Sequence, residues 1–238
     1  MAVLRYEQFF GNGVTAFTSD GSLDFLKGDP SVLPRFGMTA LQRALLDTMG
    51  VKDAVIFPKQ VHGDSVWEVT AENIDQAGVY EADAVVTATP GLAVAVRTAD
   101  CLPLLLFAPA RRVVAAVHAG WKSTRLDIAA KVVALMKAKY NVDPADIKAV
   151  IGPCIRPASY PVGVEFKDLF PKEVAQRDGC LYFDIAAANR RQLLGEGLGG
   201  KNIFDCGCDT YSDKSWHSFR RDGEASGRLI HAIMLRDQ

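Results

Sequence analysis

The chain has 238 residues, of which 49% are hydrophobic and 23% are charged, as is ordinary for a soluble globular protein. Its formal net charge of −1 gives no electrostatic reason to expect binding to nucleic acid or to a membrane surface. Charged residues also interrupt every apolar stretch before it reaches the length of a membrane span. The first residues do not resemble a signal peptide, and five cysteines without an export signal are typical of reduced thiols. We therefore expect a cytoplasmic protein.

The first half of the chain predicts one helix followed by a series of short strands. Residues 1–35 are rich in glycine and proline and predict irregular structure. Residues 39–49 carry apolar side chains at helical spacing, and Gly50 ends that helix. Runs of β-forming residues predict strands at 54–57, 65–69, 84–87, 92–97, 104–107 and 113–117. The last two runs are apolar throughout, which indicates strands buried on both faces.

The second half predicts two long helices and further strands. Ser123 or Thr124 can begin a helix that runs to about Tyr140, and Asp184 can cap another that runs to about Leu194. Strands are expected at 147–151, 203–206 and 229–235. The short links between the strands from 54 to 117 favour antiparallel or mixed sheets over a doubly wound parallel sheet. We expect an α+β protein of packed mixed β-sheets with flanking helices, forming one domain over residues 1–238.

Two histidines and one cysteine stand in short motifs marked by glycine or proline. They are His62 before Gly63, Cys101 in Asp100-Cys101-Leu102-Pro103, and His118 in His118-Ala119-Gly120-Trp121. Their separations are too long for a zinc finger but suit three neighbouring strand ends, and we expect Cys101 and His118 just beyond such ends. Two imidazoles and a thiolate can hold zinc and leave its fourth position open, as in catalytic zinc sites. Taken singly, each residue is more often an ordinary loop or core residue.

Asp100 and four basic residues complete the set of candidate site residues. An unpaired carboxylate between two apolar strands is costly, so Asp100 is expected to contact a ligand histidine, a metal-bound water or a substrate donor. We predict that it carries a proton during catalysis. The cations predicted to hold a phosphate group are Arg97, Lys122, Arg220 and Arg221. The alternative for Arg220 and Arg221 is a surface turn with an ion pair.

Six motifs occur in an order that resembles the bacterial laccase-domain family, also called the YfiH or PgeF (peptidoglycan editing factor) family. The resemblance covers about residues 50 to 238. The motifs are Gln60-Val61-His62-Gly63, Ala82-Asp83-Ala84-Val85-Val86-Thr87, Thr98-Ala99-Asp100-Cys101-Leu102-Pro103, His118-Ala119-Gly120-Trp121, Ile151-Gly152-Pro153-Cys154-Ile155 and Arg220-Arg221-Asp222-Gly223.

The resemblance implies a YfiH-like fold, likened to cysteine hydrolases, and a zinc ion bound by His62, Cys101 and His118. It implies phosphorolysis of purine nucleosides, including methylthioadenosine, and deamination of adenosine, with purine nucleosides and phosphate as partners. It also carries the older label of polyphenol oxidase. Peptidoglycan editing would then be the cellular role of an enzyme that acts on a nucleotide-linked wall precursor.

Three other hypotheses are a copper oxidase, a metal-free cysteine hydrolase and a non-catalytic binding module. A multicopper laccase needs about eight further histidines, whereas this chain has four in total, so counting excludes it. Counting does not exclude a single adventitious copper ion, because copper outcompetes zinc at many nitrogen and sulfur sites. A metal-free cysteine hydrolase would use Cys101 as nucleophile and His118 as base. A non-catalytic wall-binding module ranks lower, since no charged interaction face is evident.

Overall fold

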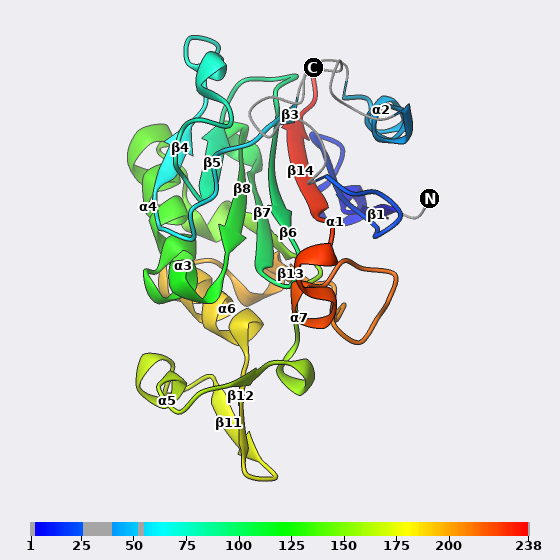
Figure 1. The fold of residues 1–238 in the computed structure, drawn as a ribbon. Coiled ribbons are helices and arrows are strands. Elements are labelled where there is room, and N and C mark those ends of the chain that lie inside the picture. Colours follow the sequence, from blue (N-terminus) through cyan, green and yellow to red (C-terminus); the bar gives the residue numbers. More distant parts are fainter. Residues whose placement is uncertain (1–2, 26–39, 52–54, 238) are drawn as a thin grey trace.

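The computed structural model describes residues 3–25, 40–51 and 55–237 (Figure 1). Two large sheets form the centre of the molecule. The first has five strands in the order β1–β2–β14–β6–β3: β1 (Val3–Arg5), β2 (Val14–Ser19), β14 (Leu229–Leu235), β6 (Ala93–Thr98) and β3 (Val55–Ile56). The second has six strands in the order β13–β9–β7–β8–β5–β4: β13 (Ile203–Asp205), β9 (Lys148–Ile151), β7 (Leu102–Ala108), β8 (Val113–Ala119), β5 (Ala84–Thr87) and β4 (Val66–Glu68).

The two sheets pack face to face, and alternation along their strands builds three hydrophobic layers. Val114 and Ala116 of β8 face the first sheet, where they meet Val94 and Val96 of β6. The other face of the six-stranded sheet packs against helices, and the other face of the five-stranded sheet packs against α2 (Ala40–Thr48). Because strand side chains alternate with a period of two, the parity of a residue decides which layer it enters. His118 has the parity of Ala116 and therefore belongs to the face between the sheets.

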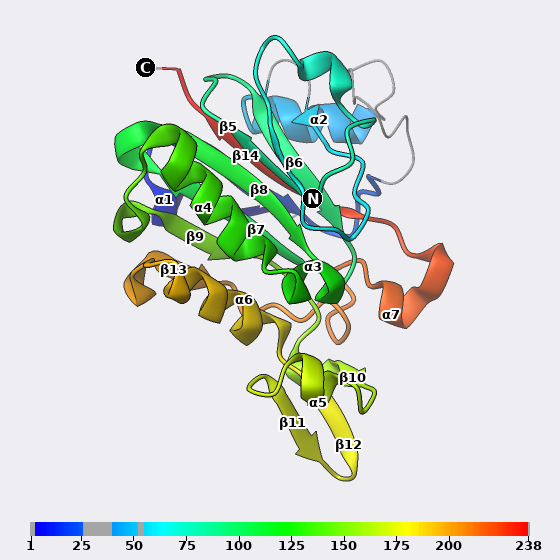
Figure 2. The ribbon, with the colours of Figure 1, turned by 90° about the vertical axis from the view of Figure 1, so that its left-hand side faces the viewer.

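Helices cover the outer face of the six-stranded sheet (Figure 2). They are α3 (Trp121–Arg125), α4 (Ile128–Tyr140) and α6 (Ile185–Gly195). Below them a small arm projects, made of a three-stranded sheet and one short helix: β10 (Pro161–Val162), β11 (Val174–Arg177), β12 (Cys180–Phe183) and α5 (Phe166–Leu169). Two further short helices are α1 (Glu7–Phe10) and α7 (Phe219–Asp222). Among the described residues no helix is both long and apolar enough to cross a membrane.

The α+β class with mixed sheets is confirmed, and most predicted elements are present. The helix from Asp184 is confirmed with its cap, since the Asp184 carboxylate accepts a hydrogen bond from the Ala187 N–H at 2.8 Å. The helix predicted at 39–49 is α2, and Thr39 lies outside the described residues, as does Ala54 of the strand predicted at 54–57.

Three expectations were wrong. Residues 1–35 are not irregular throughout, because β2 is a fully buried strand paired with both β1 and β14. The helix predicted from Ser123 or Thr124 begins at Trp121 and breaks at Leu126–Asp127, where Asp127 has a φ of 59°. His118 does not follow a strand end but lies within β8.

Candidate metal centre and its cavity

The predicted ligands His62, Cys101 and His118 come together from three separate segments. Their candidate ligand atoms all lie within 4.8 Å of one another. Cys101 lies where the chain crosses from β6 in one sheet to β7 in the other, and His118 projects from β8 between the sheets. His62 lies on the loop after β3, which the Gln60 amide ties to β6 by hydrogen bonds of 2.8 Å to both the N–H and the carbonyl of Arg97. The crossing between the sheets therefore creates the cluster.

Asp83 fixes the position of both histidines. It directly precedes β5, and its fully buried carboxylate accepts a hydrogen bond from His118 Nδ1 at 2.7 Å. The same carboxylate accepts the backbone N–H groups of Val61, His62 and Gly63 at 3.2, 3.0 and 2.6 Å. With Nδ1 donated to a carboxylate, His118 presents Nε2 as its ligand atom. This residue was part of a sequence motif, but nothing in the motif indicated its role.

Gly120 leaves the space in which the three ligands converge. A Cβ at this position would lie 3.0 Å from His62 Cδ2 and 3.2 Å from Cys101 Sγ. Two imidazoles and a thiolate form a donor set that suits zinc, and copper by the same ligand types. The residues present therefore fit a metal ion with three protein ligands.

The electrostatics of the cluster favour a thiolate. Burial alone raises the pKa of Cys101, but the charge of His118 and hydrogen bonds from both histidines lower it to about 6. Burial alone lowers the pKa of His118, but the Cys101 thiolate and Asp83 raise it to about 9. The thiolate is the form of cysteine that binds metals and also the form that attacks as a nucleophile. The charge state of Cys101 therefore suits metal binding and nucleophilic catalysis alike.

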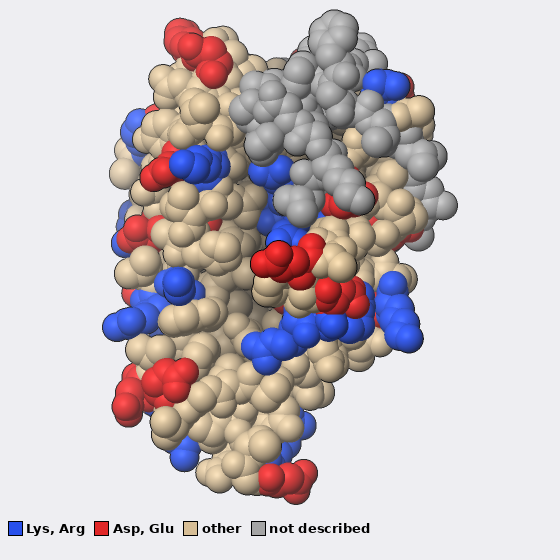
Figure 3. All heavy atoms as spheres, viewed as in Figure 1, with Lys and Arg blue, Asp and Glu red and all other residues tan. Residues whose placement is uncertain are grey.

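The cluster opens into a cavity of about 610 Å³, which is large enough for a nucleoside-sized ligand. Apolar and cationic side chains share its wall, and Figure 3 shows Lys and Arg atoms in the hollow of this face. The lining residues are Lys59, Gln60, His62, Gly78, Arg97, Thr98, Ala99, Asp100, Cys101, His118, Ile155, Tyr160, Ile185, Phe219, Arg220 and Arg228.

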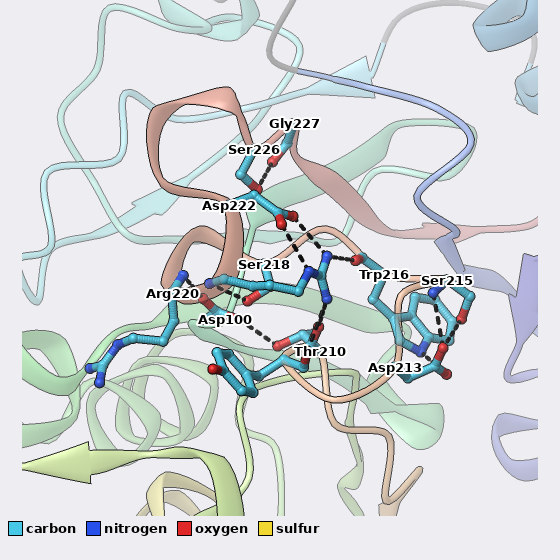
Figure 4. A network of polar contacts seen from close by, with 12 residues as sticks. Asp100, Thr210, Asp213, Ser215, Trp216, Ser218, Arg220, Asp222, Ser226 and Gly227 are labelled. Atoms are coloured by element: carbon cyan, nitrogen blue, oxygen red, sulfur yellow. Dashed lines mark hydrogen bonds and ion pairs between the residues drawn. The ribbon is translucent and has the colours of Figure 1, made fainter.

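Asp100 lines the cavity beside Cys101, but its carboxylate contacts protein donors (Figure 4). Oδ1 accepts the Thr210 hydroxyl at 2.7 Å, and Oδ2 accepts the backbone N–H of Arg220 at 2.6 Å. A hydrogen bond to a ligand histidine was one of the contacts expected for Asp100. In the structure, Asp83 makes that hydrogen bond instead. Asp100 has a φ of 83°, so its neighbours hold it in an unusual backbone conformation next to the cluster.

The four predicted phosphate-binding cations are divided between the cavity and the outside. Arg97 and Arg220 line the cavity. Lys122 is exposed beside the Trp121 ring and does not belong to the lining. Arg221 is also outside it, and its guanidinium donates to Asp222 and to the carbonyls of Thr210, Tyr211 and Trp216. Arg228 lines the cavity as well and was missed, because a single arginine before a strand carries no sequence signal.

The other two histidines have structural contacts. His231 is fully buried between two threonines, with Nδ1 2.8 Å from Thr18 Oγ1 and Nε2 2.8 Å from Thr98 Oγ1. Burial and the nearby His118 lower its pKa to about 3, so it stays neutral. His217 contacts the carbonyl of Leu23 through Nε2 at 3.0 Å. Neither belongs to the metal cluster found among the described residues.

The profile of a family described as "Multi-copper polyphenol oxidoreductase laccase" matches residues 38–236. The chain belongs to this laccase-domain family. A relative from Deinococcus radiodurans named "Purine nucleoside phosphorylase" is 39% identical over 182 residues, which are 74% of this chain and 68% of the relative. A relative of the same name from Aquifex aeolicus is 32% identical and covers 77% of this chain and 84% of its own length.

Solved structures of the same family share the fold. The Bacillus licheniformis hypothetical protein YfiH superposes with a TM-score of 0.83 at 27% identity, covering 97% of this chain and 94% of that one. YlmD from Geobacillus stearothermophilus gives 0.82 at 26% identity, covering 94% and 93%. The family resemblance predicted from the ordered motifs is confirmed. The multi-copper part of the family description does not suit this member, whose four histidines include two with structural contacts.

We predict that Asp83→Asn lowers metal affinity about 10- to 100-fold, because the amide cannot accept all four hydrogen bonds that orient His62 and His118. Competition with a chromophoric chelator measures the affinity. Asp178→Asn, at an exposed position of the arm with a φ of 50°, is the matched control and should bind like wild type. Equal affinity of Asp83→Asn and wild type would contradict this role.

We predict that Gly120→Ala folds but binds metal at least about tenfold more weakly, since the new methyl group crowds His62 and Cys101. Gly120 has a φ of −69°, which alanine adopts without strain. Gly195→Ala, where no atom lies within 4 Å of the added methyl group, serves as control. Metal content by mass spectrometry and folding by circular dichroism distinguish a local effect from unfolding.

In protein freed of metal by a chelator, alkylation of Cys101 should increase through a midpoint near pH 6, because the thiolate fraction rises as pH passes the pKa. An unperturbed thiol would show its midpoint near 9.0. Peptide mass spectrometry after timed iodoacetamide exposure measures the rate at each cysteine. Cys154 is the internal reference, since burial raises the pKa of its thiol and should keep it unreactive. A Cys101 midpoint above about pH 8 would refute the thiolate assignment.

Proposed function

We propose that this protein is a zinc-dependent purine nucleoside phosphorylase whose reaction takes place in the cavity beside His62, Cys101 and His118. The observation that carries the proposal is the junction of this three-ligand cluster with a cavity lined by both apolar and cationic side chains. The names of the relatives support the reaction class. The three candidate ligands would leave the fourth position of a tetrahedral zinc ion open, as in catalytic zinc sites. The five free cysteines are consistent with a cytoplasmic location, which we also propose.

Phosphorolysis joins phosphate to C1′ of the ribose and breaks the bond between C1′ and the purine nitrogen, which gives ribose 1-phosphate and the free base after protonation. A zinc ion held by His62, Cys101 and His118 would supply Lewis-acid polarisation of an oxygen atom. The wall residues Ile155, Ile185 and Phe219 offer an apolar surface for a flat base. The cations of the wall offset the charge of phosphate.

Asp100 is the proposed proton carrier for the departing base. Asp100 lines the cavity beside Cys101, and the donors Thr210 and Arg220 hold its carboxylate in one orientation. A fixed carboxylate at the cavity wall can take and return a proton without rearranging, which is the geometric requirement of general acid–base catalysis. Asp83 does not suit this role, because it is not among the lining residues and its carboxylate accepts hydrogen bonds from His118 and from the loop that carries His62.

We predict that adenosine and inosine release their free base and ribose 1-phosphate, and that methylthioadenosine releases adenine and 5-methylthioribose 1-phosphate, only when phosphate is present. Cys101→Ala should lower the rate at least about a hundredfold, because it removes a metal ligand. Cys180→Ala, at an exposed position of the arm outside the cavity, should keep the wild-type rate. Mass spectrometry of the products with and without phosphate is the measurement.

The same assay separates the alternatives. Deamination of adenosine would yield inosine and ammonia whether or not phosphate is present. Activity that survives a chelator but not alkylation would favour the cysteine hydrolase, and oxidation of phenols after loading with copper would favour the oxidoreductase. Conversion of none of the three nucleosides by zinc-loaded protein would overturn the proposal and favour a wall-precursor substrate.

A further inference from the structure

Two arginines of the cavity wall, Arg97 and Arg228, lie side by side and are separate from the candidate metal ligands. Arg97 is in β6 and Arg228 directly precedes β14, and these strands are antiparallel neighbours. The register pairs Arg97 with Ile230 and Thr98 with Leu229. Arg228 is therefore diagonal to Arg97 on the same face of the sheet, a spacing that long side chains easily bridge.

The structure holds both guanidinium groups through neutral contacts. Arg97 Nη1 donates to the carbonyl of Phe25 at 3.3 Å, and its guanidinium carbon lies 5.1 Å from the centre of the Phe57 ring. Arg228 Nη1 donates to the carbonyls of Ser226 and Gly227 at 2.9 Å, and its guanidinium carbon lies 5.7 Å from the centre of the Phe219 ring. Among the described residues, no ion pair or hydrogen bond links either guanidinium group to a carboxylate.

This arrangement is unfavourable without a counter-ion. Burial and the charge of Arg228 lower the pKa of Arg97, which reports the repulsion between two like charges in a partly desolvated wall. Gln60 clamps the backbone of Arg97 on both sides, so the strand cannot easily relax away. Paired guanidinium groups with free N–H donors match the oxygens of a tetrahedral anion in geometry and charge.

Two other cations line the cavity, Lys59 and Arg220. Lys59 forms an ion pair with Glu81 at 2.8 Å. Arg220 donates to the carbonyl of Pro161 at 3.1 Å, and its guanidinium lies over the Tyr160 ring. Unlike Lys59, the guanidinium groups of Arg97 and Arg228 contact no carboxylate in the described part of the chain, although the backbone N–H of Arg228 donates to Asp24 Oδ1 at 2.9 Å. Unlike Arg220, these two arginines lie side by side on neighbouring strands.

We propose that Arg97 and Arg228 together form the binding site for a phosphate group, namely the inorganic phosphate that the proposed phosphorolysis consumes. The assignment to the co-substrate rests on the proposed function, whereas binding of the anion does not. Arg97 was among the sequence candidates for phosphate binding, and Arg228 is its partner by strand register.

The test is titration of the zinc-loaded protein with inorganic phosphate alone, by calorimetry and by thermal unfolding. Phosphate should raise the unfolding temperature of the wild type, since a ligand that binds only the folded state stabilises it. Arg97→Met and Arg228→Met should each weaken phosphate binding by about tenfold or more. Arg228→Lys should retain part of the affinity, because it keeps the charge but loses the planar fork. Arg125→Met removes an exposed arginine of α3 outside the cavity and should bind phosphate like wild type.

Two results would overturn the anion site: no binding of phosphate by the wild type, or equal phosphate affinity in the wild type and both folded arginine-to-methionine variants. Nucleoside turnover then tests the assignment separately. An increase in KM for phosphate without a matching increase in KM for the nucleoside supports it. If the arginine variants weaken binding of a nucleoside 5′-monophosphate but not of inorganic phosphate, the assignment of the site to the co-substrate phosphate is overturned. Phosphate binding through these arginines in a protein that cleaves no nucleoside would retain the anion site and refute the proposed function instead.

Discussion

The Asp83 carboxylate is the constraint on which the centre depends. One buried carboxylate accepts four hydrogen bonds, from a histidine ring on β8 and from three consecutive backbone N–H groups of the loop that carries His62. Burial alone raises the pKa of Asp83, but His118 and the loop N–H groups lower it overall, so the charged form is the stable one. The interaction joins the five-stranded sheet, from which the His62 loop emerges, to the six-stranded sheet that contains His118. The same charge keeps the imidazole of His118 in the tautomer that exposes Nε2.

The position of the third ligand follows from the way the sheets are connected. The chain leaves β6 at Thr98 and enters β7 at Leu102, which leaves three residues to pass from one sheet to the other. Such a short crossing forces a tight backbone, and Asp100 takes a positive φ at its centre. Cys101 is thereby fixed at the end of the space between the sheets, where His118 also points. Placing reactive groups on a connection held by two sheets gives them precision that a free loop lacks.

Local patterns in the sequence predicted those parts of the fold that local physics determines. The strands β7 and β8 are apolar enough to be recognised, and Asp184 caps α6 through a contact three residues away. The wrong predictions concern segments whose conformation depends on residues far away in the sequence. β2 reads as part of a glycine-rich start, yet it is a strand because β14, far along the chain, pairs with it. The three members of the candidate metal cluster were recognisable from their motifs. The contacts of Asp83 and the pairing of Arg228 with Arg97 depend on register between strands that no single segment encodes.

The cavity wall carries acidic, basic and apolar side chains, and the contacts of the charged ones differ. Near the candidate metal ligands, the Asp83 carboxylate and the Cys101 thiolate stabilise the positive charge of His118. Elsewhere on the wall, Arg97 and Arg228 stand over aromatic rings, and their guanidinium groups contact no carboxylate in the described part of the chain. The first group of residues suits a metal cation and the second suits an anion, and apolar side chains share the same wall. A ligand that is neutral in its middle and meets a metal on one side and phosphate on the other satisfies both groups at once. A nucleoside approached by phosphate has this distribution of charge, which a phenol or a peptide substrate does not.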